Sequence, residues 1–242
     1  LCGSVRFTSR KAIRESLTGR IHFVELLPFS ISEIEGDPLP AKILGLLESK
    51  NLLLYSNQIS YSASQNIKRR QSIEKYLKKG GLPGVCFIRE EKLRRNQIQD
   101  QLQTVLDRDV RQIYSTTLSY EKILSYVRAL AENQGSPIHF EHLKSKTEIT
   151  PITQQNLLYA LEAAFFIRRI PIEGGKKGFT VIFEDQAESF LLSQNQLQRS
   201  VQLTHLLFRN IRTEFYYRLN KHINFFQYRS RGGVVIPLAL RS

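Results

Sequence analysis

Residues 119–183 carry the pattern that most constrains how this chain can fold: three helical segments followed by two short strands. In the first segment, apolar residues recur at the spacing of a single helix face, and the segment ends before Gly135-Ser136-Pro137. These residues are Tyr120, Ile123, Leu124, Val127, Leu130 and Ala131. The spacing predicts an amphipathic helix that buries one face in a core.

The segments that follow complete the pattern. A short second helix is expected over 139–146, and Thr150 with Pro151 is typical of the start of a third helix, which runs to about residue 166. Strands are predicted over 168–172 and 179–183, on either side of a loop rich in glycine and lysine. Three helices followed by such a hairpin predict a winged helix-turn-helix over 119–184.

If this module binds DNA, the start of the third helix and the loop of the hairpin are the candidate contacts. The helix would present Thr153, Gln154, Gln155 and Asn156 to base edges, and Lys176 and Lys177 would reach phosphates. Within 150–167 the only charged residue is Glu162. A protein partner for this helix therefore remains open beside DNA.

The charge of the whole chain favours a polyanionic partner. Its 242 residues include 35 Lys and Arg against 22 Asp and Glu, a formal charge of +13. The excess is concentrated in 41–118, with 14 basic and 7 acidic residues, and in 173–242, with 10 and 5. The densest runs are Lys68-Arg69-Arg70, Lys75 with Lys78-Lys79, Arg89 to Arg95, Lys176-Lys177, and Arg229 with Arg231.

The rest of the chain predicts further helices and a few strands. We expect helices over 9–17, 41–48, 65–79 and 91–114, and one long helix from 185 to about 219. Strands are expected near the start of the chain, over 21–27, and over 225–229 and 234–240. Asp109 falls near the apolar face of the 91–114 helix, so its carboxylate must find a partner. The fold class is therefore mainly α, within α+β.

Most kinds of catalytic site have no sequence support. There is no GxxxxGK[ST] phosphate loop, so Phe179 to Asp185, an apolar strand ending in an acidic pair, is better explained as the second hairpin strand. Two cysteines, Cys2 and Cys86, are too few for a disulfide scaffold or zinc site and fit a cytoplasmic protein. His139 and His142 have no third ligand in reach, so no metal site and no catalytic residue are predicted. No apolar run is long enough to cross a membrane.

An ordered series of short motifs resembles one family, the prokaryotic AAA-type (AAA+) ATPases whose P-loop domain is joined to a winged helix and then to a restriction-nuclease-like domain. The first motifs are Leu1-Cys2-Gly3-Ser4, then Ser16 to Arg20, then Leu26 to Glu33. Tyr76 to Pro83 contains the Gly80-Gly81 pair, and Thr104 to Asp109 contains Arg108 and Asp109. Leu158 to Ile167 is similar to a late motif of the same family.

The resemblance implies four regions. They are the end of an ATPase core (1–40), a helical lid (41–118), the winged helix (119–184) and part of a nuclease-like domain (185–242). Ser4 would be the sensor residue, and Arg20 a candidate for the arginine that stabilises the γ-phosphate; the family uses ATP and Mg²⁺. The family's phosphate loop precedes these motifs, so we expect a fragment that is inactive alone and has no cofactor of its own.

The last region departs from the family pattern. Val235 and Pro237 stand where the resemblance implies the Glu and Asp of a metal site, and neither can ligate magnesium. A degenerate, inactive nuclease-like region is therefore expected.

Three functions follow from these expectations. The first is an ATPase fragment whose winged helix binds DNA or a protein. The second is a subunit that supplies Arg20 in trans to a complete ATPase. The partners expected are DNA, a complete ATPase subunit or further copies of the same chain. The third is a stand-alone winged-helix regulator, which leaves the first two motifs unexplained.

Overall fold

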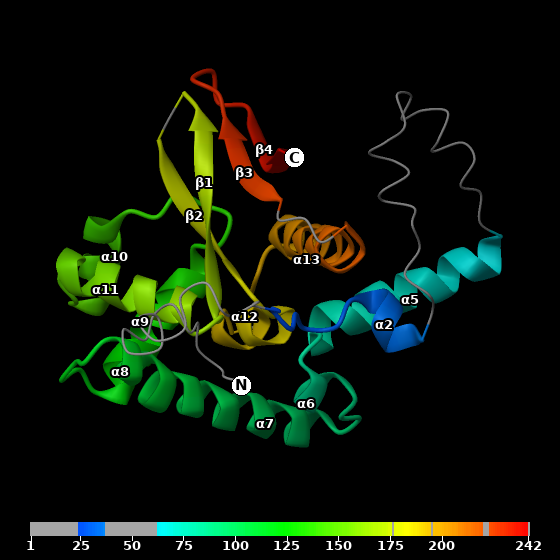
Figure 1. The fold of residues 1–242 in the computed structure, drawn as a ribbon, viewed down its shortest axis with the longest axis horizontal. Coiled ribbons are helices and arrows are strands. Elements are labelled where there is room, and N and C mark those ends of the chain that lie inside the picture. Colours follow the sequence, from blue (N-terminus) through cyan, green and yellow to red (C-terminus); the bar gives the residue numbers. More distant parts are fainter. Residues whose placement is uncertain (1–23, 37–61, 176, 195, 220–222, 242) are drawn as a thin grey trace.

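The protein belongs to the α+β class, with many helices around one small mixed sheet (Figure 1). The computed structural model describes residues 24–36, 62–175, 177–194, 196–219 and 223–241. The helices are α2 (Ile31–Glu35), α5 (Ala63–Lys79), α6 (Pro83–Cys86), α7 (Glu91–Thr104), the π-helix η2 (Val105–Asp109), α8 (Val110–Ile113), α9 (Tyr120–Glu132), α10 (Phe140–Thr147), α11 (Pro151–Ala163), α12 (Gln186–Leu192) and α13 (Arg199–Leu219). The strands are β1 (Ile167–Gly174), β2 (Gly178–Phe183), β3 (Asn224–Arg229) and β4 (Val235–Arg241).

The helices α9, α10 and α11 enclose the main apolar core, which we call the three-helix core. Ile123, Val127, Leu130, Leu157 and Leu161 are buried there, in agreement with the predicted apolar face. Each of the outer helices begins at a capping residue. The side chain of Ser119 accepts a hydrogen bond from the backbone of Lys122, and that of Thr150 accepts one from Thr153.

The sheet joins the predicted hairpin to the end of the chain. Its strand order is β2-β1-β3-β4, with β1 antiparallel to β2, β1 parallel to β3, and β3 antiparallel to β4. Helix α13 covers one face through Phe208, which packs with Ile170, Ile182 and Phe225 (Figure 1). The expected boundary between residues 184 and 185 therefore separates strands that share one sheet.

The predicted helix over 91–114 is one continuous helical stretch with a π-helical turn at 105–109. The extra residue in that turn alters the helical phase. Asp109 is buried, and Arg108 donates a hydrogen bond to its carboxylate at 2.9 Å. The expectation that Asp109 must find a partner is confirmed.

Two predicted elements are corrected. The long helix expected from residue 185 is two helices, α12 and α13, because residues 193, 194 and 196–198 are not helical; the side-chain amide of Gln202 donates to the backbone carbonyl of Leu197 just before α13. The strand expected over 21–27 is irregular at its described end, 24–27, where side-chain hydroxyls bond the backbone in place of a neighbouring strand. The predicted helices over 9–17 and 41–48, and the strand near the chain start, lie outside the described residues.

Within the described part of the chain, no helix combines the length and the apolar character needed to cross a bilayer.

Candidate nucleic-acid interface

Helix α11 presents an uncharged face to solvent. Ile152, Gln155, Asn156 and Tyr159 are exposed, and their spacing places them on one side of the helix. Of the predicted contacts, Gln155 and Asn156 are thus accessible and Thr153 is partly so. This face can donate and accept hydrogen bonds and make apolar contacts, but it carries no charge for phosphates.

Gln154 is a correction. Its side chain is fully buried, and its amide nitrogen donates to the carbonyls of Ile149, at 2.7 Å, and Phe140, at 3.1 Å. The amide holds the turn between α10 and α11, since its nitrogen bonds one carbonyl at the start of α10 and one in the turn itself. Gln154 therefore leaves the set of candidate contacts.

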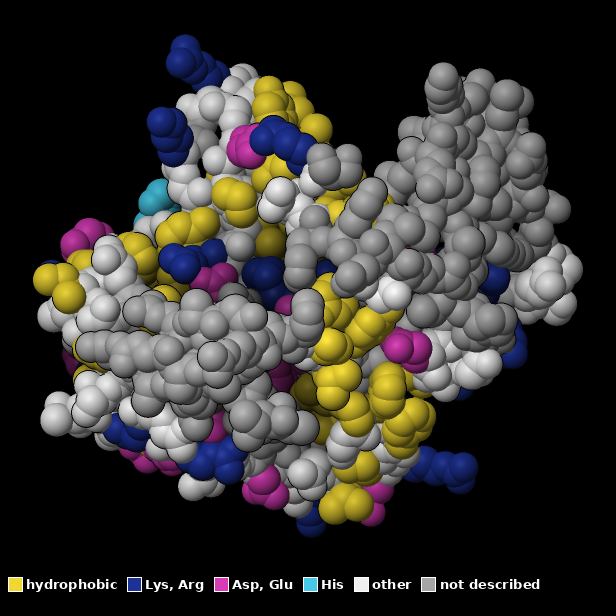
Figure 2. Space-filling view, in the orientation of Figure 1, with side chains coloured by type: hydrophobic (Ala, Val, Ile, Leu, Met, Phe, Trp, Pro, Cys, Tyr) yellow, Lys and Arg dark blue, Asp and Glu magenta, His cyan; other side chains and the backbone are white. Residues whose placement is uncertain are grey.

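The tip of the β1–β2 hairpin lies against the turn between β3 and β4. The backbone N–H of Gly175 donates to the carbonyl of Arg229 at 2.7 Å, and a Cβ at Gly175 would lie 2.5 Å from Cγ of Arg231. Lys177 and Arg231 are exposed, and neither forms a salt bridge with a described residue. Figure 2 shows Lys and Arg side chains projecting at this end of the sheet. We call Lys177 and Arg231 the tip cations.

Most other cations of the three-helix module have carboxylate partners; Arg128, on α9, is exposed and forms no salt bridge with a described residue. Lys122 pairs with Glu148, Lys146 with Glu132, Lys144 with Glu141, and Arg169 with Glu162. Such exposed pairs stabilise little, but they neutralise the surface on which they lie. Among the described residues, the tip cations are therefore two neighbouring positive charges that form no salt bridge and can meet an external anion.

Arg231 was missing from the predicted site although its charge run was visible in the sequence. The reason is topological: the parallel pairing of β1 with β3 brings residues about 55 positions apart to one end of the sheet. Nothing in a local pattern specifies that pairing. Lys176, the other predicted contact in the loop, lies outside the described residues, as do Ser4 and Arg20.

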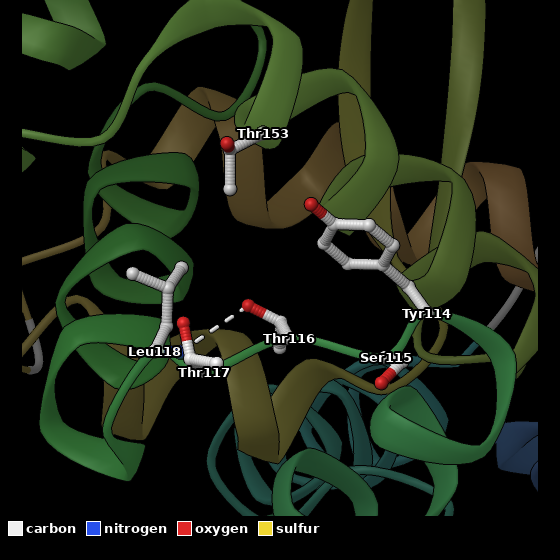
Figure 3. A pocket seen from close by; sticks show the side chains of 6 residues that line it. All are labelled: Tyr114, Ser115, Thr116, Thr117, Leu118 and Thr153. Carbon is white, nitrogen blue, oxygen red and sulfur yellow. Dashed lines mark hydrogen bonds between the residues drawn. The ribbon is translucent and has the colours of Figure 1, made fainter.

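A pocket of about 310 Å³ adjoins the start of α11. Its lining is Tyr114, Ser115, Thr116, Thr117, Leu118 and Thr153 (Figure 3). The guanidinium of Arg111 braces this loop by donating to the carbonyls of Thr116, at 2.9 Å, and Leu118, at 2.8 Å. With hydroxyls and no charged lining residue, the pocket offers hydrogen bonds and little affinity for ions.

Gly80 and Gly81, predicted as motif residues, pack directly on the end of the sheet. Gly81 donates its backbone N–H to Oδ2 of Asp185 at 2.7 Å, and a Cβ at Gly80 would lie 2.1 Å from Oδ1 of the same carboxylate. Gly80 also has a positive φ of 66°, which favours glycine. Asp185 caps α12 through the N–H of Ala187 at 2.8 Å. The two glycines thus hold the turn between α5 and α6 against Asp185, which lies between β2 and α12.

Beside Asp185 lies a group of charges, with Glu184 and Arg209 buried and the others partly buried, which we call the charged interface: Glu25, Arg168, Glu184, Arg209 and Arg212. Glu184 accepts hydrogen bonds from Arg168 at 3.1 Å, Arg209 at 3.3 Å and Arg212 at 2.5 Å. Burial by itself would raise the pKa of Glu184, but the three arginines outweigh burial and lower the pKa to about 2. Glu25 bonds Arg168 and Arg212 from the other side.

The charged interface also holds residues 24–30 in place. Arg209 donates to the carbonyl of Pro28 at 2.9 Å, and Tyr76 donates to that of Phe29 at 2.9 Å. The hydroxyls of Tyr216 and Tyr217 accept from the backbone of Glu25 and Leu27. These contacts satisfy the backbone of an irregular segment, which explains why it needs no neighbouring strand.

A buried histidine completes this region. Nε2 of His205 is 2.5 Å from the carbonyl of Phe183, and Nδ1 bonds the side-chain amide of Gln186. Burial lowers the pKa of His205 to about 4, so the ring is neutral at pH 7. The structure places Oε1 of Gln186 against Nδ1. A neutral ring that donates from Nε2 can only accept at Nδ1, so turning the Gln186 amide over would bring its otherwise unpartnered nitrogen into this bond.

Carboxylates in this region do not form a metal site. Burial raises the pKa of Asp185, and burial with the neighbouring negative charges of Asp185 and Glu184 raises that of Glu188. Among the residues that the structure describes, no three His, Cys, Asp or Glu side chains are grouped to hold a metal ion.

Comparison with known proteins yields one match. A family model described as a domain of unknown function (DUF8612) matches residues 70–172, from within α5 to within β1. No match was found among curated proteins or among solved structures. The matched stretch contains the second half of α5, the helices from α6 to α8 and the three-helix core, and it ends before the tip cations.

Proposed function

We propose that residues 119–184 form a winged helix-turn-helix that binds duplex DNA mainly through the phosphate backbone. Three helices are followed by an antiparallel hairpin, and α11 carries the exposed polar side chains expected of a helix facing base edges. The observation that carries the proposal is that the two exposed tip cations lie together at one end of the sheet and form no salt bridge with a described residue, whereas most other cations of the module are paired. Backbone binding needs such free cations, since it is driven by release of counterions.

The experiment is fluorescence anisotropy of a labelled duplex with the full chain. Lys177→Ala with Arg231→Ala should weaken binding about tenfold at 0.1 M salt. The negative slope of log K against log salt should become less steep by about two, because each lost phosphate contact contributes about 0.9. The matched control is Arg95→Gln with Arg199→Gln, which removes two cations that already pair with Glu91 and Glu74. An affinity and slope equal to those of the wild type in the tip variant would refute this role.

Gln155 and Asn156 test base contact separately. Replacing both with alanine should reduce discrimination between duplexes of different sequence and leave the salt slope unchanged, because neither side chain carries charge. A selection of random duplexes with both proteins measures that discrimination.

A protein partner for α11 is the second candidate. Ile152 is 74% exposed and Tyr159 is 52% exposed, seven residues apart on the same face. Aromatic and aliphatic anchors of this kind are typical of protein contacts. Ile152→Ser with Tyr159→Ser should abolish such an interaction, and the tip variant should leave it intact.

The resemblance to AAA-type ATPases supports a further proposal for the rest of the chain: that it assists a complete ATPase, with Arg20 acting in trans. The tight packing of Gly80-Gly81 on Asp185 gives that motif a physical role but does not depend on nucleotide. ATP hydrolysis by a complete family member, with and without this chain and its Arg20→Ala variant, tests the proposal. No stimulation by the wild-type chain would refute it.

A further inference from the structure

A second group of cations that form no salt bridge with a described residue lies on helices α5 and α7 and the segment between them, which the resemblance interprets as a helical lid, away from the hairpin. Nζ of Lys79, at the end of α5, and Nη1 of Arg94, on α7, both approach the carbonyl oxygen of Ile88, at 3.4 Å and 3.2 Å. The two cations share one neutral acceptor, and neither forms a salt bridge with a residue that the structure describes. Lys75 and Arg89 are close enough to act electrostatically on Lys79, and both are exposed.

The carboxylates nearby are engaged elsewhere or make no bond to this group. Glu91 pairs with Arg95, and Glu74 pairs with Arg199. Glu90 precedes α7 and forms no salt bridge with a described residue. Burial, followed by the positive charges of Arg94 and Lys75, lowers the pKa of Lys79, which is the direction expected where like charges crowd together.

The positive charge extends along α5. At 100° per residue, Lys68, Lys75 and Lys79 fall within about 40° of one another around the helix. With a rise of 1.5 Å per residue, the stripe is about 16 Å long. A strand of duplex DNA places one phosphate about every 3.4 Å along its axis, so the stripe spans about five phosphates.

We propose that Lys68, Lys75, Lys79, Arg89 and Arg94 form a second nucleic-acid-binding surface, which contacts the phosphate backbone. We call these residues the lid cations. A stripe of this length fits an extended polyanion better than a single phosphate, and the arginines can bond phosphate oxygens with two N–H groups. This surface is independent of the tip cations, so the two can be tested apart.

The experiment uses the full chain carrying Lys177→Ala and Arg231→Ala, so that the remaining binding reports on the lid. Labelled single-stranded and duplex oligonucleotides of one sequence are titrated over a range of salt. Adding Lys75→Gln and Arg89→Gln should weaken the remaining binding at least fivefold. The slope of log K against log salt should become less steep by about 1.4 for the single strand or about 1.8 for the duplex. These two side chains are exposed and form no salt bridge with a described residue, so the fold should be unaffected.

Adding Arg95→Gln and Arg199→Gln to the same background is the matched control, and it should change the affinity less than twofold. Inorganic phosphate and ATP at millimolar concentration should compete weakly. Equal affinity with and without the Lys75 and Arg89 substitutions would overturn the inference. So would complete competition by free phosphate, or binding to phosphatidylserine vesicles with no binding to either oligonucleotide. Loss of the tip effect with a retained lid effect would refute only the role of the hairpin.

Discussion

The three-helix core and the charged interface are both buried, but they are held together by different forces. In the three-helix core, Val127, Leu130 and Leu161 are fully buried among other apolar side chains. In the charged interface, Arg209 has no exposed surface and lies against Glu184 and a backbone carbonyl. The first is stabilised by removing apolar surface from water, the second by mutual satisfaction of charges that burial alone would disfavour.

This difference determines how each region should respond to substitution. Removal of apolar atoms from the core leaves a cavity whose cost grows with its volume. Removal of one charge from the interface leaves its former partners with fewer opposite charges, so that part of the cost of burying them is no longer compensated. The interface should therefore be the more brittle of the two regions.

Arg209→Ala is the largest expected effect. It leaves Glu184 short of one partner and the Pro28 carbonyl without its donors, so the free energy of unfolding should fall by about 3–5 kcal/mol. Urea unfolding measures it, with Leu161→Ala in the core as comparison, expected at about 2–5 kcal/mol. A loss below about 1 kcal/mol for Arg209→Ala would mean that the charged interface does not hold residues 24–30.

His205 predicts a pH dependence that the three-helix core lacks. Its folded pKa, about 4, lies below the ordinary value of 6.5, so the unfolded chain binds the proton more readily. Stability should therefore fall as the pH drops from 6.5 to 4, by up to about 3 kcal/mol. The difference in unfolding free energy between the wild type and His205→Gln, measured across this range, isolates the histidine from Glu188, whose raised pKa acts in the opposite direction. A constant difference would contradict the burial of a neutral ring.

Gly81→Ala tests the contact between the turn that joins α5 to α6 and residues 24–30, which the charged interface holds in place. A Cβ there would lie 2.1 Å from the backbone oxygen of Phe29, so one of the two backbone segments must shift, at a cost of about 1–3 kcal/mol. Gly84→Ala is the control, because its Cβ meets nothing within 4 Å and alanine favours the helix. Thermal unfolding should show a lower midpoint for the first variant and an equal or higher one for the second. Equal midpoints for both variants would show that the backbones at Gly81 and Phe29 are not in close contact.

Thr150→Ala is the smallest expected effect and concerns the three-helix core. The side chain caps α11, so its loss should cost about 1 kcal/mol. Thr150→Ser, which keeps the hydroxyl, should recover most of the loss in chemical denaturation. No recovery would show that the methyl group, and not the cap, is what matters at this position.

Sequence patterns predicted the three-helix core and its hairpin because the information there is local. Apolar spacing, the Thr150-Pro151 start and the glycine-rich loop each specify their own element. The parallel pairing of β1 with β3 joins segments about 55 residues apart, and no local pattern indicates it. The π-helical turn in the 91–114 helix and the break after Leu192 were not predicted either.

The charged interface was missed for the same reason. Glu25, Glu184 and Arg209 are far apart in the sequence, and each alone is typical of a solvated surface. Of the predicted DNA contacts, Lys177 and Asn156 are exposed, whereas Gln154 is buried because a short turn uses its amide. The sequence of α11 does not show whether a glutamine side chain faces solvent or, like that of Gln154, bonds the backbone of the preceding turn.

The salt dependence of duplex binding tests the central claim most directly. The full chain, titrated with a labelled duplex between 0.05 and 0.3 M salt, should give a line of log K against log salt whose slope becomes less steep by about two in the Lys177→Ala and Arg231→Ala variant. The Arg95→Gln and Arg199→Gln control should keep the wild-type slope. If the tip variant and the control follow the same line as the wild type, the hairpin does not contact phosphates and the proposed function is wrong.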